Sequence, residues 1–199
     1  MTKSRKTYSR QRKKEGFYKE AKKIDVRARS YFKLEQVDNK FNLIKEGQTI
    51  IDLGCAPGAW LEYIDKKLET GTIIGIDLLE IKKQHEFSDK IEIIQDDFNN
   101  IDEYNFEEFD LVLSDMAPEF SGDSFADRGR THKLNIATLN FCKNHLKKGG
   151  NLMFKSFEGE DLPQVRKIAK KMFEEVKEYK PHSSQKKSAE VFEICLSKL

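Results

Sequence analysis

The 199-residue sequence contains only three cysteines, Cys55, Cys142 and Cys195, and they are widely spaced. An odd number of isolated cysteines argues against a disulfide framework or a zinc site and is typical of a reducing compartment, so we expect a cytoplasmic protein. His132 and His145 have no partner at the spacing of metal ligands, and we therefore expect no metal site.

Long apolar runs are also missing. No stretch approaches the roughly 18 apolar residues that cross a bilayer, so we expect no membrane association through a spanning helix. The N-terminus is basic but lacks the apolar core of a secretory signal, and we do not expect it to be one. Without internal repeats, this length predicts one folded domain, and nothing in the sequence suggests an obligate oligomer, so we expect a monomer.

Negative charge is scarce at one end of the chain. Residues 1–30 hold 12 Lys and Arg against three Asp and Glu, a net charge of +9, whereas the other 169 residues hold 24 against 31, a net charge of −7. Phe17 and Tyr18 lie among the basic residues. This composition suits a phosphate backbone with stacked bases, although a solvated tail is the alternative. We expect a basic N-terminal arm over 1–27 and a folded domain over 28–199.

A glycine-bearing turn follows the first apolar run. Residues 52–60 read Asp-Leu-Gly-Cys-Ala-Pro-Gly-Ala-Trp, between a β-branched run at 49–51 and a helical pattern. Such a strand–turn–helix unit presents backbone N–H groups to a polar ligand, and Gly54 and Gly58 allow the backbone a positive φ. The spacing matches neither the Gly-x-Gly-x-x-Gly fingerprint nor the P-loop, so the turn alone leaves an ordinary connection open.

Acidic residues end four successive apolar runs. Because the carboxyl ends of parallel strands share one edge, we expect these side chains to gather there. Asp77 lies 19 residues after Gly58, close to the separation at which an acidic residue reaches ribose hydroxyls. One such residue is often only a turn former, but four predict a site for a polyhydroxylated or cationic ligand. They are Asp52, Asp77, the pair Asp96 and Asp97, and Asp115.

Further motifs extend along the chain. They are Asp-Leu-Leu at 77–79, Ser-Asp-Met-Ala-Pro at 114–118, Phe-Lys-Ser-Phe-Glu-Gly at 154–159 and Ser-Ala-Glu-Val at 188–191. With the turn at 52–60, this ordered set resembles the FtsJ/RrmJ-like family of S-adenosylmethionine-dependent ribosomal RNA ribose 2′-O-methyltransferases. The resemblance implies an α/β, Rossmann-like methyltransferase fold, with a doubly wound, mostly parallel seven-stranded sheet and an antiparallel last strand.

The same resemblance implies the site residues. The catalytic tetrad is expected to be Lys33, Asp115, Lys155 and Glu190, with Lys155 activating a ribose 2′-hydroxyl, Asp115 orienting it, and the other two positioning lysine and ribose. The expected contacts to S-adenosylmethionine are Gly54, Gly58, Trp60, Asp77, Asp97 and Asp115. A buried ammonium at the end of a strand needs a carboxylate partner, which for Lys155 could be Asp115, Glu158 or Glu160.

The implied activity is methyl transfer to a ribose 2′-hydroxyl of RNA, and the expected substrate is large-subunit ribosomal RNA, at a uridine, free or in a ribosomal subunit. Three alternatives stay open. Transfer RNA could undergo the same chemistry. A dehydrogenase could use Asp77 to bind NAD, although the dinucleotide fingerprint is missing. A non-catalytic RNA-binding protein is disfavoured because every tetrad position holds the expected residue type.

Hydrophobic periodicity predicts the remaining elements. Before the first strand we expect an amphipathic helix over 28–41. Later in the chain we expect a long polar loop over 116–130, a helix from 134 to 146, a strand from 151, a helix over 162–173, a strand starting near 177, and the last strand over 190–196.

The basic arm leads to a prediction about RNA affinity. Each phosphate neutralised on a single strand contributes roughly −0.7 to the slope of log K against log salt. If about four arm residues contact phosphate, deleting residues 2–22 should flatten that slope by roughly 3 units while leaving cofactor affinity unchanged. RNA affinity measured at several salt concentrations for both proteins tests this, and equal slopes would show that the arm takes no part in RNA binding.

Overall fold

The structure, a computed structural model, describes residues 29–82, 87–118, 124–159, 161–184 and 188–199. The arm expected over 1–27 lies outside these ranges. No helix in the described ranges is both long and apolar enough to cross a membrane.

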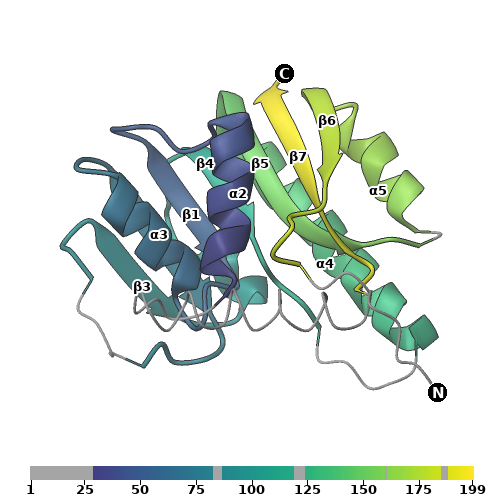
Figure 1. Cartoon of the computed structure of the whole chain (residues 1–199), viewed down its shortest axis with the longest axis horizontal. Coiled ribbons are helices and arrows are strands. Elements are labelled where there is room, and N and C mark those ends of the chain that lie inside the picture. The colour runs from purple at the N-terminus through teal and green to yellow at the C-terminus, as the bar shows by residue number, and fades with distance from the viewer. Residues whose placement is uncertain (1–28, 83–86, 119–123, 160, 185–187) are drawn as a thin grey trace, which may run out of the picture.

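The described residues form one seven-stranded sheet in the order β3-β2-β1-β4-β5-β7-β6 (Figure 1). Strands β1 to β5 run parallel to one another, whereas β7 is antiparallel to both β5 and β6. This confirms the predicted sheet with its antiparallel last strand. The strands are β1 Thr49–Leu53, β2 Thr72–Asp77, β3 Ile91–Gln95, β4 Phe109–Ser114, β5 Leu146–Phe157, β6 Phe173–Tyr179 and β7 Glu190–Lys198.

The strand order reverses at β1. From β1 the chain adds β2 and then β3 on one side, and β4 and β5 on the other. The connections leaving β1 and β4 therefore diverge, and a crevice at such a switch point is where open α/β sheets bind ligands. The glycine-bearing turn follows β1 directly, so the topology brings it to this point.

Helices cover both faces of the sheet, as a doubly wound fold requires (Figure 1). Helices α2 (Tyr31–Phe41) and α3 (Ala59–Lys67) pack on one face, and α4 (Ser124–His145) and α5 (Leu162–Ala169) on the other. Neighbouring residues of β1 show the division: Ile50 packs in the cluster with Leu34 and Leu61, and Ile51 packs in the cluster with Leu139 and Val165. A 3-10 helix, η1 (Phe98–Glu103), connects β3 to β4.

Several predicted boundaries were wrong. The long loop expected over 116–130 is shorter, because α4 begins at Ser124, and β5 begins at Leu146 rather than near 151. A register irregularity near Phe109 lets β5 pair with β4 before the glycines at 149 and 150, which a sequence pattern reads as a helix stop.

The helix expected over 162–173 ends at Ala169, and β6 starts at Phe173 instead of near 177. Phe173 continues the helical spacing of Leu162, Val165 and Ala169, so periodicity could not separate it from the helix. Pairing with β7, in which Phe173 faces Lys198, decides the conformation.

A buried ion pair attaches α5 to the sheet. The Arg166 guanidinium donates to both carboxylate oxygens of Glu193, at 2.9 Å and 2.6 Å, and Glu193 is fully buried on β7. Breaking such a pair by removing one partner leaves a buried charge without compensation.

Arg166→Ala should therefore lower the free energy of unfolding by about 3–5 kcal/mol in urea denaturation. The matched control is Lys177→Ala, which breaks the half-exposed pair between Lys177 and Glu175 and should cost less than about 1 kcal/mol. Equal, small losses for the two variants would contradict a structural role for the buried pair.

Candidate active site

Side-chain alternation along the strands places four candidate residues on the face covered by α2 and α3. Along a strand, residues two apart lie on the same face of the sheet. Ile50 of β1 packs in the core under α2 and α3, so Asp52, two residues later, lies on the same face. The same even spacing from a core residue of the same strand holds for Asp77, Asp115 and Lys155. All four come at or just after the carboxyl ends of parallel strands or, for Lys155, near the end of β5. The predicted gathering of acidic side chains at one edge is therefore confirmed for Asp52, Asp77 and Asp115, and Lys155 joins them through its ion pair with Asp115.

The first ion pair joins α2 to β7. The Lys33 Nζ atom lies 2.8 Å from each carboxylate oxygen of Glu190, the first residue of β7. The side chains are only 9% and 14% exposed, so each charge depends on the other for compensation. The Lys33 ammonium also lies 5.7 Å from the centroid of the Phe192 ring.

The second ion pair joins β5 to the end of β4. The Lys155 Nζ atom lies 2.8 Å from the Asp115 Oδ1 atom, and the ammonium also donates to the Asp115 backbone carbonyl. Lys155 and Asp115 are 10% and 22% exposed. Asp115 is thus the carboxylate partner that the buried lysine required. Of the alternatives, Glu158 pairs with Lys180 at 3.3 Å, and residue 160 lies outside the described ranges.

The two pairs form one cluster. In the antiparallel pairing of β5 with β7, Lys155 lies opposite Phe192 and Phe157 lies opposite Glu190. Burial raises the pKa of Glu190, but the Lys33 charge, hydrogen bonds from Lys33 and Ser184, and the Lys155 charge outweigh burial and hold that pKa below its usual value. Glu190 is therefore ionised at neutral pH.

The glycine-bearing turn has the backbone conformation that its sequence predicted. Gly54 has a φ of 78° and Gly58, at the N-cap of α3, a φ of 93°. The Asp77 Oδ2 atom accepts a hydrogen bond from the Ala56 backbone N–H, and its Oδ1 atom accepts one from the Leu79 backbone N–H, both at 2.8 Å. Asp77 thus fixes the turn through both of its carboxylate oxygens.

Met116 lies so close to Gly54 that a side chain at this position has no room. A Cβ atom added there would lie 2.8 Å from the Met116 Cγ atom and 3.0 Å from the Met116 Cα atom. Met116 directly follows Asp115, so this contact packs the end of β4 against the turn. Glycine at position 54 is needed for that packing.

Two predicted cofactor contacts have structural roles in this protein. The Trp60 indole is buried in the core and donates from Nε1 to the Ser30 carbonyl at 3.0 Å. The Asp97 Oδ1 atom caps η1 by accepting hydrogen bonds from the backbone N–H and side-chain amide of Asn99, at 2.8 Å and 2.9 Å. These bonds tie Trp60 to the residue that precedes α2 and Asp97 to the connection after β3, outside the lysine–carboxylate cluster.

Asp52 was predicted as one of the acidic residues at this edge but not as a cofactor contact, and the structure gives it greater weight. Both of its carboxylate oxygens are buried with no hydrogen-bond partner among the described residues. Burial raises its pKa well above the usual value, and the charges of Asp115 and Asp77 raise it further. Three carboxylates thus converge on a site that is complementary to a positively charged ligand. Among the described residues, no group of three His, Cys, Asp or Glu side chains is arranged to hold a metal ion.

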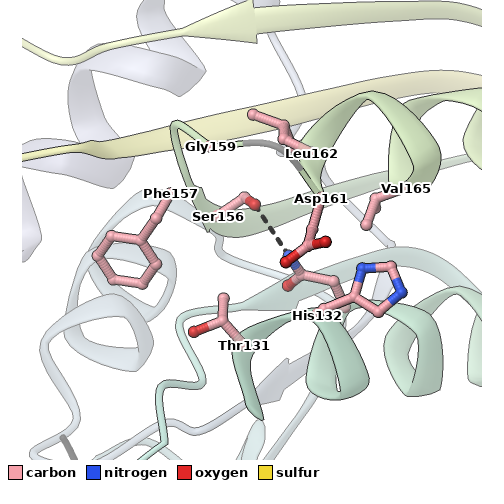
Figure 2. A pocket seen from close by; sticks show the side chains of 9 residues that line it. Thr131, His132, Ser156, Phe157, Gly159, Asp161, Leu162 and Val165 are labelled. Atoms are coloured by element: carbon pink, nitrogen blue, oxygen red, sulfur yellow. Dashed lines mark hydrogen bonds between the residues drawn. The ribbon is translucent and has the colours of Figure 1, made fainter. Parts of the chain in front are cut away.

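A small cavity lies on the other face of β5, between α4 and α5 (Figure 2). Its volume of about 20 Å³ has room for about one water molecule, and Thr131, His132 and Asp161 are among its lining residues. Asn135 donates a hydrogen bond to Ser156 at 2.9 Å, which ties α4 to the strand position next to Lys155. This hydrogen bond supports the end of β5 from the α4 side, and no residue of the lysine–carboxylate cluster lines the cavity.

Asp52→Asn should increase the free energy of unfolding of the ligand-free protein at pH 7. Because the folded-state pKa of Asp52 is raised, its ionisation is unfavourable in the folded state, and this penalty appears as pH rises above about 4. The gain should be about 1 kcal/mol or more at pH 7 and should vanish near pH 4, as measured by urea denaturation. The exposed Asp89→Asn is the control, and a less stable Asp52→Asn protein at pH 7 would contradict the unpaired carboxylate.

Comparisons with known proteins identify the family of this chain. The family model for FtsJ-like methyltransferases matches residues 26–198. The chain is 37% identical to the ribosomal RNA large subunit methyltransferase E of Bdellovibrio bacteriovorus, over 92% of this chain and 95% of that protein. It is also 37% identical to the protein of that name from Methanocaldococcus jannaschii, over 93% and 79%.

Among solved structures, a protein described as a ribosomal RNA methyltransferase from Plasmodium falciparum superposes with a TM-score of 0.74 at 25% identity, over 87% of this chain and 99% of that one. The family match covers nearly the whole described domain, and the sheet has the topology that the family resemblance implied. The chain therefore belongs to the FtsJ-like methyltransferase family.

Proposed function

We propose that this methyltransferase moves a methyl group from S-adenosylmethionine to a ribose 2′-hydroxyl of large-subunit ribosomal RNA. The observation that carries the proposal is the joining of the Lys33–Glu190 and Lys155–Asp115 ion pairs into one buried cluster at the carboxyl edge of the sheet. Two lysines held by two carboxylates suit chemistry at a hydroxyl group, because they fix a basic nitrogen and a positive charge where a proton must leave.

The residues around the turn fit the proposed cofactor. S-adenosylmethionine supplies an electrophilic methyl group on a sulfonium and also carries an ammonium and two ribose hydroxyls. The unpaired Asp52 carboxylate and its neighbours Asp77 and Asp115 suit these positive and hydroxyl groups. The proposed binding set is Gly54, Gly58, Trp60, Asp77, Asp97 and Asp115, together with Asp52.

The proposed catalytic roles follow from the ion pairs. Lys155 meets the 2′-hydroxyl oxygen through Nζ, either accepting its proton when neutral or stabilising the alkoxide when charged. Asp115 holds that nitrogen in place from Oδ1 and from its backbone carbonyl. Lys33 and Glu190 contact the ribose from the α2 side and shape the electrostatic surroundings of Lys155. The contribution of the protein is thus alignment and proton handling.

The names of the curated relatives support large-subunit ribosomal RNA as the substrate class, and this applies to the chain by similarity. Transfer RNA remains the alternative substrate, because a cluster that acts on a ribose hydroxyl does not recognise the base and so does not distinguish one RNA from another. Buried free cysteines at positions 55, 142 and 195 fit a reducing compartment, and we infer that the protein acts in the cytoplasm. We also propose that it acts as a monomer.

Lys155→Ala should lower methyl transfer by about 10²- to 10⁴-fold, the range that proton transfer by a positioned side chain contributes. Cofactor affinity measured by calorimetry should persist, because the turn does not depend on Lys155. Lys155→Arg should not restore activity, because arginine does not deprotonate and its planar fork differs in shape. The matched control is Lys147→Ala, which removes an ion-paired lysine at the other end of the same strand and should stay active.

The assay follows a labelled methyl group from the cofactor into isolated ribosomal particles, large-subunit RNA and transfer RNA. We expect incorporation into large-subunit RNA or its particle. Label in transfer RNA alone would overturn the proposed substrate, and full activity of Lys155→Ala would overturn the proposed chemistry.

A further inference from the structure

The Gln36 side chain of α2 binds the turn over 181–184, which precedes β7. The Gln36 Oε1 atom accepts hydrogen bonds from the backbone N–H groups of His182 and Ser183, at 2.7 Å and 3.3 Å. The Ser184 backbone N–H bonds to the Pro181 carbonyl at 3.1 Å and closes the turn. Gln36 lies three residues after Lys33, close to one helical turn further along α2. The helix that carries the buried lysine therefore also holds this turn.

The turn over 181–184 places the Ser184 hydroxyl against the buried Glu190 carboxylate. The Ser184 Oγ atom donates to the Glu190 Oε1 atom at 2.8 Å, and the Lys33 Nζ atom lies 2.8 Å from both carboxylate oxygens. A single ammonium between the two oxygens is a point charge and sets the carboxylate plane only weakly, whereas a hydroxyl donor from a second segment restricts its rotation. The same hydroxyl favours the ionised form and helps to hold the pKa of Glu190 low.

We propose that Ser184 and Gln36 are positioning residues of the active site. Gln36 fixes the turn over 181–184 on α2, and Ser184 fixes the Glu190 carboxylate that holds Lys33. This inference rests on the proposed function for its catalytic consequence, whereas the contacts themselves can be tested without substrate.

Kinetics of Ser184→Ala test the positioning role. We expect kcat to fall about tenfold or more, the scale of a hydrogen bond to a charged group, with KM for RNA and cofactor affinity within about twofold. Ser184→Thr keeps the hydroxyl and should recover most of the activity. The control is Ser183→Ala: its hydroxyl is buried without a partner among the described residues, so its removal should leave kcat unchanged. A rise in KM alone would make Ser184 an RNA contact and overturn the proposal.

A double-mutant cycle separates positioning from general loop stability. If Ser184 acts through the carboxylate, Ser184→Ala should cost nothing further on a Glu190→Gln background, because the group that it positions is already altered. Gln36→Met, which keeps the length but removes the acceptor, should lower kcat in the wild-type background and have no further effect on the Glu190→Gln background. Equal losses in both backgrounds would show that these residues act independently of Glu190.

A titration provides a readout that needs no RNA. NMR of carboxyl-labelled glutamate should show a higher pKa for Glu190 in Ser184→Ala than in the wild type, and an unchanged pKa in Ser183→Ala. An unchanged pKa in Ser184→Ala would overturn the contact and with it the proposal. If the pKa rises but the wild type methylates no RNA, the proposed function fails while the contact stands, so the two failures are distinguishable.

Discussion

Charge compensation at the carboxyl edge of the sheet is the constraint on which the rest of the site depends. Lys33 and Lys155 are each exposed by a tenth or less, and an ammonium so poorly hydrated is tolerable only beside a carboxylate. Each residue comes from a different place in the fold, because α2, β5 and β7 supply one residue each and Asp115 directly follows β4. The relative placement of these four elements therefore has to be accurate, and the two layers of apolar core on either face of the sheet provide that accuracy.

One buried carboxylate next to the glycine-bearing turn, that of Asp52, has no compensating partner in the described part of the chain. Asp52 has neither an ion pair nor a hydrogen bond within the described residues, and two further carboxylates raise the cost of its ionisation. A protein selected for stability alone would replace it, since buried polar groups without partners are rare. Sites that bind a charged ligand commonly give up stability in this way, because the binding partner completes them. The unpaired carboxylate thus supports the assignment of this edge to a cationic cofactor.

The sequence predicted the sheet well because local signals define it. Apolar runs that end in an aspartate identify both a parallel strand and the edge where its side chain emerges, and the turn at 52–60 has the positive φ angles expected of its glycines. The order of motifs provided the lysines and Glu190 through resemblance, since no spacing rule links Lys33 to a residue 157 positions away.

The residues that were missed depend on contacts that leave no local pattern. Gln36 and His182 are 146 positions apart, and a glutamine on an amphipathic helix reads as an ordinary solvated residue. The unpaired state of Asp52 depends on what the two neighbouring strands, β2 and β4, present to it. The end of α5 was misplaced for a similar reason, because pairing with β7 overrode a helical periodicity that continued to Phe173.

The antiparallel direction of β7 explains why this sheet can hold two ion pairs at one edge. A parallel strand delivers its last residues to the carboxyl edge, as β4 does for Asp115 and β5 for Lys155. Because β7 runs the other way, its first residue lies at that edge, and Glu190 is paired opposite Phe157 near the end of β5. A parallel strand of the same sequence would place Glu190 at the far edge, away from Lys33. Because β7 is antiparallel, the carboxylate that pairs with Lys33 of α2 comes from the first residue of a strand and not from its last.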